Sequence, residues 1–491
     1  MSDIMKSIPF GQLTEWILNE YKKTGQVFGI QKAYVADQSK TIEIFGRKLE
    51  NPVGPAAGPH TQLAQNLVAA YVAGARFFEL KTVQKMDGQE LSACIPKPCI
   101  VAEEEAYNCE WSTELYVPQA MEEYIKGWIL IHVIAKEFGI GSPDGFQFNM
   151  SCGYNLEGIK DKKIDDFIEG LKDAGDTAIF KECKQWLLEH ISLFEHVTKE
   201  DVEAIPAKVC NSITLSTMHG CPPQEIENIV RYLLKEKHIN TYVKCNPTLL
   251  GYEFVRKAMD DLGYDYMAFT DFHFKDDLQY EDAVPMLKRL LETAAQEGLS
   301  FGVKLTNTFP VDIKRQELPG EEMYMSGKAL FPLSISVASR LAESFDGKLP
   351  MSFSGGADQK NIDQIVGCGI WPVTVATVLL KPGGYKWLTR IAEKADTCEI
   401  EKCGNVQVEE LKKLATDSLT DAHYRKTGRK AAGKRTEEKS PLLDCLKKNG
   451  VGEKKEFTGH KRVCGNCADV CPNRANVLIE VPEMELLQIL H

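Results

Sequence analysis

The sequence predicts a TIM (β/α)8 barrel, in which eight parallel strands alternate with helices around a closed core. Helical stretches such as 62–74, 224–235 and 333–345 separate short apolar runs. Alternation of this kind, repeated eight times, is typical of that barrel. The expected strands are centred near residues 53, 78, 148, 213, 243, 303, 351 and 374.

Length and composition limit the class of protein. The chain has 491 residues, of which 43% are hydrophobic and 26% charged, as expected for a soluble globular protein. Single hydrophobic cores stop growing at about 250–300 residues, so this length allows one large domain and a smaller one. The net charge of −12 argues against a general nucleic-acid binder.

Targeting signals and cysteine usage predict the compartment. Membrane-spanning helices need about 18 or more apolar residues in a row, and the sequence has no such run. The segment 1–6 lacks the apolar core of a signal peptide. The 15 cysteines therefore indicate a reducing interior, where thiols serve metals or chemistry. We expect a cytoplasmic protein.

The first two strands carry unusual residues at their ends. After a helical lead-in and a hairpin over 41–51, the strand 51–58 ends in Ala56, Ala57 and Gly58. Such small side chains let a flat ligand approach the backbone closely. The second strand, 76–82, ends in Lys81 and Thr82. Because a buried lysine costs free energy unless it meets an anion or a ring, either a salt bridge or a ligand contact could explain Lys81.

Residues 83–145 interrupt the strand–helix alternation. The segment is acidic around 103–105 and contains an expected helix over 121–138. We interpret it as a helical insertion that forms a lid or an interface, and it hints at self-association into a homo-oligomer.

The third strand delivers polar groups to its carboxyl end, where this fold collects its catalytic residues. It is apolar at Phe146, Phe148 and Met150 and breaks at Gly153. Amides, a thiol and a phenol at the end of this strand suit a planar ligand that forms hydrogen bonds. The alternative is that these residues only cap the strand end and bind no ligand. The polar residues are Asn149, Ser151, Cys152, Tyr154 and Asn155.

The later strands also end in polar or small residues. The strand 212–216 leads into the loop 217–223, where His219 and Cys221 could transfer a proton. A glycine pair after strand seven occupies a place where this fold commonly binds phosphate. The other strand-end residues are Lys244 on strand five, Thr306, Asn307 and Thr308 after strand six, Ser354, Gly355 and Gly356 after strand seven, and Ala376 and Thr377 after strand eight.

The carboxyl-terminal part differs in character. Residues 401–440 are hydrophilic and turn basic after 424, which predicts a solvated linker. Further on, Cys464, Cys467 and Cys471 are followed by Pro472, as in the last part of the ferredoxin run C-x2-C-x2-C-x3-C-P.

The spacing of these cysteines predicts a [4Fe–4S] cluster, with zinc or idle thiols as alternatives. Lys461 stands where the first cysteine of the run is expected, and Cys445 is the nearest upstream thiol. We expect Cys445 as the fourth ligand, but the module looks incomplete. The cluster could therefore be labile, absent or completed by another chain.

These motifs resemble the dihydroorotate and dihydropyrimidine dehydrogenase family of FMN barrels. Over nearly the whole chain they look still more like the amino-terminal part of the proteins called selenate reductase subunits. The matching segments are 51–58, 80–83, 151–155, 243–244, 306–308, 354–356 and 376–377. The resemblance implies an FMN barrel over 1–400, the linker 401–440 and a partial ferredoxin-like segment over 441–491.

The resemblance also implies roles for single residues. Those expected at FMN are Ala56, Ala57, Gly58, Lys81, Thr82, Asn149, Lys244, Thr306, Gly355, Gly356, Ala376 and Thr377. Those expected at the substrate are Asn155, Thr214, Asn307 and Thr308.

One departure from the family concerns proton transfer. The family's fourth strand usually ends Asn-x-Ser-Cys-Pro, with the cysteine or a serine as proton donor or acceptor. Here Thr214 stands where the asparagine is expected and Thr217 where the base is expected. Cys221 in the same loop, Cys152 on the neighbouring strand and His219 are the remaining candidates. The longer relatives also carry an NAD(P)H- and FAD-binding module, and no Gly-x-Gly-x-x-Gly run occurs here.

The resulting hypothesis is an FMN-dependent oxidoreductase that transfers hydride to or from a nitrogen heterocycle such as urate, xanthine or uracil. The cluster would pass electrons between the flavin and a partner protein. The first rival is a non-catalytic electron-transfer subunit of a molybdenum-type, selenate-like reductase complex. The second is a flavin-free barrel, such as an aldolase with a Schiff base on Lys81 or Lys244.

Overall fold

The computed structural model describes residues 5–426, apart from 38–39, 103–104, 218 and 401–402. The predicted iron–sulfur segment 441–491, with Cys445, Cys464, Cys467 and Cys471, lies outside the described residues and stays a prediction. Among the described residues, no group of three or more metal-ligating side chains could hold an ion. In the same part of the chain, no helix is long and apolar enough to cross a membrane.

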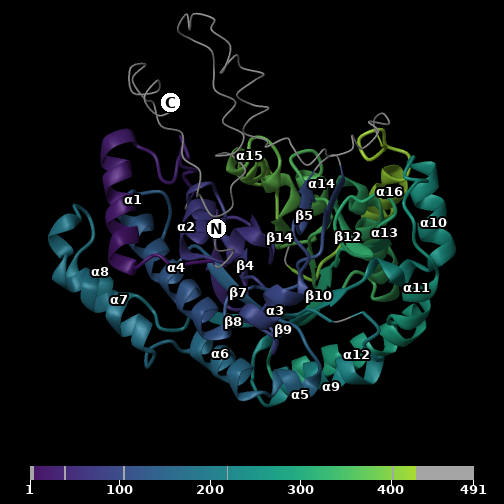
Figure 1. Cartoon of the computed structure of the whole chain (residues 1–491), viewed down its shortest axis with the longest axis horizontal. Coiled ribbons are helices and arrows are strands. Elements are labelled where there is room, and N and C mark those ends of the chain that lie inside the picture. The colour runs from purple at the N-terminus through teal and green to yellow at the C-terminus, as the bar shows by residue number, and fades with distance from the viewer. Residues whose placement is uncertain (1–4, 38–39, 103–104, 218, 401–402, 427–491) are drawn as a thin grey trace, which may run out of the picture.

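Eight parallel strands form the predicted TIM barrel (Figure 1), and each expected strand is present. Between the first and last strands of the sheet, Arg76 N donates a hydrogen bond to Val53 O at 2.9 Å. Gly54 allows this approach, because a Cβ there would lie 1.5 Å from Phe77 O. The strands in sheet order are β3 (Val53–Pro55), β14 (Val373–Val375), β13 (Met351–Phe353), β10 (Phe301–Leu305), β9 (Asn240–Cys245), β8 (Cys210–Leu215), β7 (Gln147–Cys152) and β4 (Phe77–Glu79).

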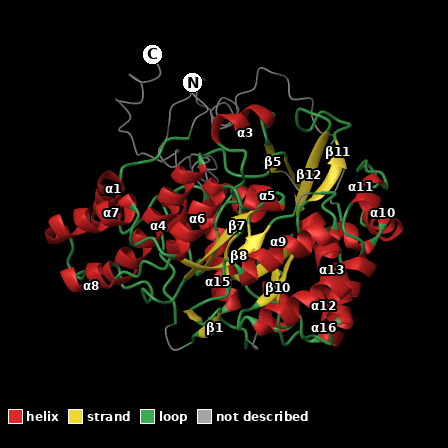
Figure 2. Cartoon of the chain, turned by 90° about the horizontal axis from the view of Figure 1, so that it is seen from below, coloured by secondary structure: helices red, strands yellow, loops and turns green. Residues whose placement is uncertain are grey.

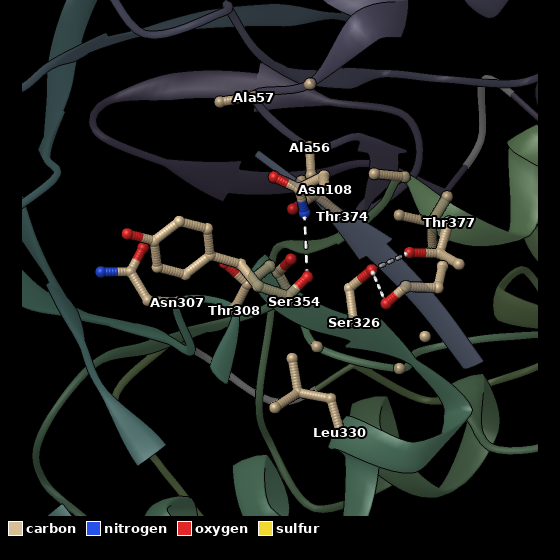
Figure 3. Close-up of a pocket in the computed structure, with 18 of the residues that line it drawn as sticks. Ala56, Ala57, Asn108, Asn307, Thr308, Ser326, Leu330, Ser354, Thr374 and Thr377 are labelled. Atoms are coloured by element: carbon tan, nitrogen blue, oxygen red, sulfur yellow. Dashed lines mark hydrogen bonds between the residues drawn. The ribbon is translucent and has the colours of Figure 1, made fainter. Parts of the chain in front are cut away.

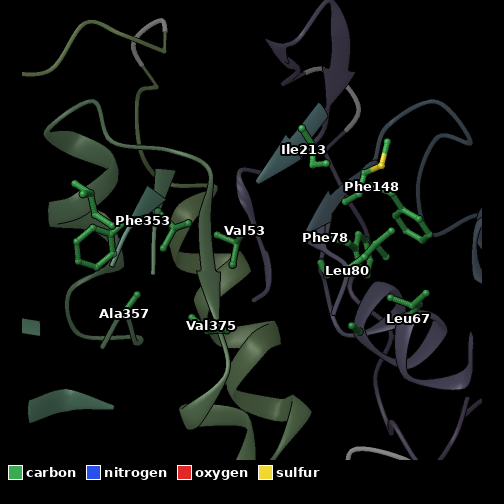
Figure 4. Packing of buried hydrophobic residues seen from close by; sticks show 14 of the residues in the cluster. Val53, Leu67, Phe78, Leu80, Phe148, Ile213, Phe353, Ala357 and Val375 are labelled. Atoms are coloured by element: carbon green, nitrogen blue, oxygen red, sulfur yellow. The ribbon is translucent and has the colours of Figure 1, made fainter. Parts of the chain in front are cut away.

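Helices surround the barrel and bury the outward-facing residues of the strands. Figure 4 shows Phe78, Phe148 and Ile213 in this layer, and all three are fully buried. The ring of Phe148 contacts Trp128 with 5.4 Å between centroids. The principal helices are α2 (Ala64–Val72), α4 (Val117–Glu137), α6 (Lys162–Lys172), α9 (Pro223–Lys235), α12 (Tyr280–Gln296), α13 (Phe331–Ser344), α14 (Ile362–Gly367) and α15 (Tyr385–Ala395).

The predicted hairpin closes the amino-terminal end of the barrel. Strands β1 (Ile42–Ile44) and β2 (Arg47–Leu49) pair antiparallel around Phe45. The Phe45 ring packs edge-on against Tyr242, and Gln147 Nε2 donates to Ile44 O at 3.0 Å. The hairpin therefore leaves the carboxyl-terminal end as the open one.

The expected helical insertion differs from the structure. Within 83–145, α3 (Gly88–Cys94) precedes the strands β5 (Ile100–Ala102) and β6 (Glu105–Asn108). The remaining helix, α4, is the barrel's own crossover between β4 and β7 and packs on α2. The insertion is thus shorter than expected and is partly strand.

A second sheet covers the open end of the barrel. Strands β5 and β6 join β12 (Glu322–Gly327) and β11 (Phe309–Asp312) in the antiparallel order β11-β12-β6-β5. We call this four-stranded sheet the roof. Figure 2 shows it at the opposite end of the molecule from β1.

The described part of the expected linker, residues 403–426, packs against the barrel domain. Helix α16 (Val408–Ser418) packs against α13, and its Leu411 is fully buried. Beyond it, the Tyr424 ring stacks on Phe331 with 4.6 Å between centroids. The expectation of a solvated linker is therefore wrong for this part, because Leu411 and Ala415, one turn apart, form an apolar face within a polar helix.

Replacing Leu411 tests whether α16 belongs to the barrel. We expect Leu411→Ala to lower the free energy of unfolding by about 2–5 kcal/mol, since it removes buried methyl groups. Chemical denaturation of the full chain provides the measurement. Lys413→Ala, on the exposed face of the same helix, should change it by no more than about 0.5 kcal/mol. Equal stability of both variants would restore the linker interpretation.

Candidate active site

A cavity of about 780 Å³ lies between the carboxyl ends of the strands and the roof (Figure 3). The roof contributes Asn108 from β6, and Tyr324 and Ser326 from β12. Most of the site residues predicted from sequence line this cavity. They are Ala56, Ala57, Gly58, Lys81, Thr82, Thr217, His219, Lys244, Thr306, Asn307, Thr308, Gly355, Gly356, Ala376 and Thr377.

The glycine pair after β13 forms one side of the cavity. Gly355 and Gly356 have φ angles of 104° and 87°, which L side chains rarely adopt. A Cβ on Gly356 would also lie 2.6 Å from Gly327 O. Neither N–H makes a hydrogen bond to a described residue. Two backbone donors are thus available to an anion in the cavity.

Next to the glycines, the loop after the neighbouring strand β14 completes this side of the cavity. Thr377 begins the short 3-10 helix η5 (Thr377–Leu380), and its Oγ1 lies 2.9 Å from Ser326 Oγ on the roof. A Cβ on Gly58 would lie 3.5 Å from the Cβ of Ala376. The roof and the ends of the neighbouring strands β3 and β14 therefore meet at this point.

Three lysines lie at or below the floor of the cavity. Lys304 of β10 is fully buried and pairs with Glu79 of β4 at 3.0 Å. Lys304 and Lys244 are register partners on β10 and β9, so both point into the barrel. Burial lowers the pKa of Lys304 to about 8. The sequence reasoning missed this pair, although a Lys and a Glu within two apolar strands were visible signals.

The second lysine is held by the insertion. Lys81 Nζ lies 2.9 Å from Glu110 Oε2, and both side chains are buried. Glu110 also lines the cavity. Lys81 therefore forms the salt bridge that was one explanation for it. It also lies at the cavity, where the other explanation, a ligand contact, would place it.

The third lysine is the unpaired cation of the floor. Lys244 Nζ makes no hydrogen bond or ion pair with any described residue. Burial lowers its pKa, although the charge of Glu79 opposes this shift. Since Lys81 and Lys304 are each paired to a glutamate, Lys244 is the one of these three floor lysines without an ion-pair partner among the described residues.

A polar network joins the loop after β8 to the substrate side of the cavity. His219 Nδ1 lies 2.9 Å from Asp277 Oδ2. Asn246 Nδ2 donates to the same carboxylate oxygen at 3.0 Å, and Asn246 Oδ1 accepts from Asn307 Nδ2 at 2.7 Å. Burial raises the Asp277 pKa, but hydrogen bonds from His219, the Gly220 N–H and Thr248 outweigh this and hold it below its usual value.

Neither cysteine expected to transfer protons lines the cavity. Cys152 is fully buried on the face of β7 that carries Phe148, and this face packs against α4 in the helix layer. Cys221 is half-buried and lines a separate space of about 10 Å³ behind Thr217. Burial raises the pKa of Cys221 to about 11. The structure thus leaves His219 and Thr217 as the candidates at the cavity.

Three predicted amide and hydroxyl contacts also lie away from the cavity. Asn149 Nδ2 donates to Thr214 Oγ1 at 2.9 Å inside the barrel, so these two residues satisfy each other. Asn155 caps the short helix α5 (Leu156–Ile159), where its Oδ1 accepts from Gly158 N at 2.9 Å. The alternative of an ordinary strand-end cap is the correct one for Asn155.

The sequence reasoning missed several residues of the site. Asn246 directly follows the predicted strand five, so its position was a usable signal. Asp277 lies in an acidic, aromatic stretch before α12 that carries no motif. Asn108 and Tyr324 come from roof strands that pair with each other and that the sequence analysis did not predict.

Thiol labelling of the folded protein tests the placement of Cys152. We expect N-ethylmaleimide to modify Cys94, which is exposed, well before Cys152, whose pKa burial raises. Peptide mass spectrometry after timed labelling distinguishes these sites. Labelling of both at the same rate in folded protein would contradict the placement of Cys152 in the helix layer.

The comparisons with known proteins agree with the barrel. The family model described as "Oxidoreductase YgfK, N-terminal TIM-barrel domain" matches residues 28–426. The chain is 46% identical over 459 residues to "Putative oxidoreductase YgfK" of Escherichia coli strain K12, and equally to that of E. coli O157:H7. Each match covers 91% of this chain and 44% of the relative, so the chain spans less than half the length of these relatives.

Among solved structures, the chain is similar to DHODH from Eimeria tenella, crystallised in complex with ferulenol. The TM-score is 0.45 at 15% identity, and the match covers 83% of this chain and 93% of that chain. The family model covers most of the chain and ends at the last described residue, which follows α16 and the stacked Tyr424. The chain therefore belongs to the family of the amino-terminal TIM-barrel domain of the oxidoreductase YgfK.

Proposed function

We propose that the cavity binds FMN and that the chain transfers hydride to or from a nitrogen heterocycle, an oxopurine or oxopyrimidine such as urate, xanthine or uracil. The observation that supports this most is the combination of an anion-binding glycine pair and one unpaired lysine in a single cavity. A flavin mononucleotide has a phosphate for the first and a ring that becomes electron-rich for the second. When bound, the flavin supplies or accepts the hydride.

The residues present fit this cofactor. The free N–H groups of Gly355 and Gly356, beside Ala376 and Thr377, would hold the phosphate. The small residues Ala56, Ala57 and Gly58, with Lys81, Thr82 and Thr306, would surround the ring. Asn149 is left out, because it bonds to Thr214 below the cavity floor.

The charge of the floor supports a ring that gains electrons. The Lys304–Glu79 and Lys81–Glu110 pairs are neutral overall, so Lys244 supplies the remaining positive charge. A cation at low dielectric favours the anionic form of a neighbouring group. Lys244 would therefore stabilise the reduced cofactor more than the oxidised one.

Polar residues from the end of β10 and from the roof suit a heterocycle. Asn307, Thr308 and Asn108 present amide and hydroxyl groups that can match ring carbonyl and N–H groups. A tetrahedral oxyanion such as selenate would favour arginine, and no described residue that lines the cavity is an arginine. The cavity thus supports the heterocycle over the selenate alternative.

Electrons would reach or leave the flavin through a partner protein or the predicted [4Fe–4S] segment. In the alternative proposal, the chain is only an electron-transfer subunit. The two proposals differ in whether the reduced chain reacts with a heterocycle.

The direct test uses the FMN-loaded full chain without oxygen. After reduction with dithionite, urate, xanthine and uracil are added in turn while the flavin absorbance is followed. Reoxidation by one heterocycle supports the proposed function. A flavin that none of them reoxidises would favour the electron-transfer subunit. A protein that stays colourless with added FMN would exclude both flavin proposals.

Replacing Gly356 tests the phosphate site. We expect Gly356→Ala to weaken FMN binding at least tenfold but riboflavin binding much less, because only FMN carries the phosphate. Quenching of flavin fluorescence measures both affinities. Gly367→Ala, whose added Cβ meets nothing within 4 Å, serves as the control. Equal weakening of both ligands by Gly356→Ala would place the phosphate elsewhere.

Replacing Lys244 tests the charge of the floor. We expect Lys244→Met to make the midpoint potential of the bound flavin more negative by about 30 mV or more, since about 1.4 kcal/mol corresponds to 30 mV for a two-electron couple. Dye-coupled photoreduction measures the potential. Lys162→Met, at an exposed lysine, should leave it unchanged. An unchanged or more positive potential in Lys244→Met would contradict the assignment.

A further inference from the structure

We infer that His219 is the acid–base residue that exchanges a proton with the heterocycle, and that Asp277 is the residue that positions it. The inference rests on the proposed function, because it names the proton-transfer group of that same site. It assigns the role to a histidine of the cavity wall in place of the two cysteines that the family resemblance favoured.

The surroundings of Asp277 fix which nitrogen of His219 carries a proton. The Asp277 side chain is 1% exposed, and its carboxylate accepts from Gly220 N at 2.9 Å and Thr248 Oγ1 at 2.7 Å. A carboxylate held by N–H and O–H donors stays ionised and only accepts hydrogen bonds. His219 Nδ1 must therefore carry the hydrogen in the bond to Asp277.

This tautomer leaves Nε2 of His219 as the acceptor in the neutral ring. Nε2 lies on the opposite side of the ring from the Asp277 bond, and the His219 side chain lines the cavity. A base oriented by a buried carboxylate is the arrangement that general acid–base catalysis requires.

Aromatic neighbours hold the plane of the ring. Tyr324 of the roof lies nearly parallel to His219, with 5.9 Å between centroids and 14° between planes. The ring of His273 meets it edge-on with centroids 5.4 Å apart. His219 thus lies between the roof and α11 (Phe272–Asp276) and has little freedom to turn its Nε2 away.

The network also ties the base to the substrate side of the cavity. Asn246 contacts both Asp277 and Asn307. Asn307 is the residue expected to form hydrogen bonds with the heterocycle. One chain of hydrogen bonds therefore positions both the base, His219, and this substrate contact.

The charged and titratable groups around His219 come from several elements. They are Asp277 on the loop after α11, His273 and Asp276 on α11, Glu322 and Tyr324 on β12, Lys244 on β9 and Cys221 on its own loop. Two of these, Asp277 and Glu322, are partners of the two histidines. The hydrogen bond from His273 Nε2 to Glu322 raises the pKa of His273.

The proton balances the hydride transfer. In the direction of reduction, a bound reduced flavin would supply a hydride, with its two electrons, to one ring atom of the heterocycle. The adjacent ring atom gains the proton from Nε2–H of the His219 imidazolium, which becomes neutral. In the reverse direction His219 takes the proton, and Asp277 stabilises the resulting positive charge.

The first experiment determines the tautomer of His219 and needs no cofactor. In the full chain with 15N-labelled histidine, the nitrogen shifts above pH 7 should show His219 protonated at Nδ1 only. The His219→Gln variant assigns the signals. In Asp277→Asn the amide can donate to Nδ1, so the signals should move toward the Nε2–H form. A wild-type Nε2–H form, or a tautomer that Asp277→Asn leaves unchanged, would overturn the positioning role.

The second experiment reads the reaction. In the FMN-loaded, dithionite-reduced chain, reoxidation by whichever of urate, xanthine and uracil reacts should slow about 100-fold or more in His219→Gln and in Asp277→Asn. Asp277→Glu should recover part of the loss. Dithionite reduction itself should keep its wild-type rate in all variants. His196→Gln, at an exposed histidine, should behave as wild type.

The outcomes separate the two proposals. If the wild-type chain is reoxidised and His219→Gln keeps the rate, the inference fails and the proposed function stands. If Cys221→Ser alone abolishes reoxidation, the proton donor is the thiol and the inference fails. If no heterocycle reoxidises the wild-type chain, the proposed function fails and the catalytic role of His219 fails with it.

Discussion

The buried ion pair between Lys304 and Glu79 links the strands beneath the cavity. Lys304 Nζ also donates to Thr374 Oγ1 at 2.6 Å and to Ser352 Oγ at 3.2 Å, so one ammonium connects β10, β4, β14 and β13. Removing one partner of such a buried pair typically costs about 3–5 kcal/mol, because the other charge is left uncompensated. Because this pair has no net charge, the neighbouring Lys244 determines the charge of the cavity floor.

The roof covers the open end of the barrel and so forms one wall of the cavity. Its strands come from two segments about two hundred residues apart, and Tyr324 pairs with Asn108 across them. The salt bridge from Glu110 to Lys81 fastens the insertion to the end of β4. The same segments thus cover the site, supply its polar wall and hold one of its lysines. Whether the roof opens for substrates as a lid remains a proposal.

The sequence predicted the barrel because each strand is a local apolar run that ends in unusual polar or small residues. Lys81, Lys244, Gly355 and Gly356 were identifiable for this reason. The roof was missed because its strands are short and because its two hairpins, β5–β6 and β11–β12, become one sheet only through the long-range pairing of β12 with β6. Asp277 was missed because only the folded chain brings it to His219.

Other predictions were wrong although the sequence contained the pattern that would have corrected them. Strand alternation places Cys152 on the same face as Phe148, and so in the helix layer rather than at the site. Asn155, at the start of a helix, has the position of an N-cap residue. The hydrophilic composition of 401–440 concealed the apolar face of α16, where Leu411 and Ala415 lie one turn apart.

A crystal structure of the full chain grown with FMN tests the central claim most directly. The account predicts flavin density in the cavity beneath the roof, with its phosphate on the N–H groups of Gly355 and Gly356 and its ring beside Lys244. Folded protein whose cavity contains no flavin at saturating FMN, or a flavin bound with its phosphate away from the glycine pair, would contradict it.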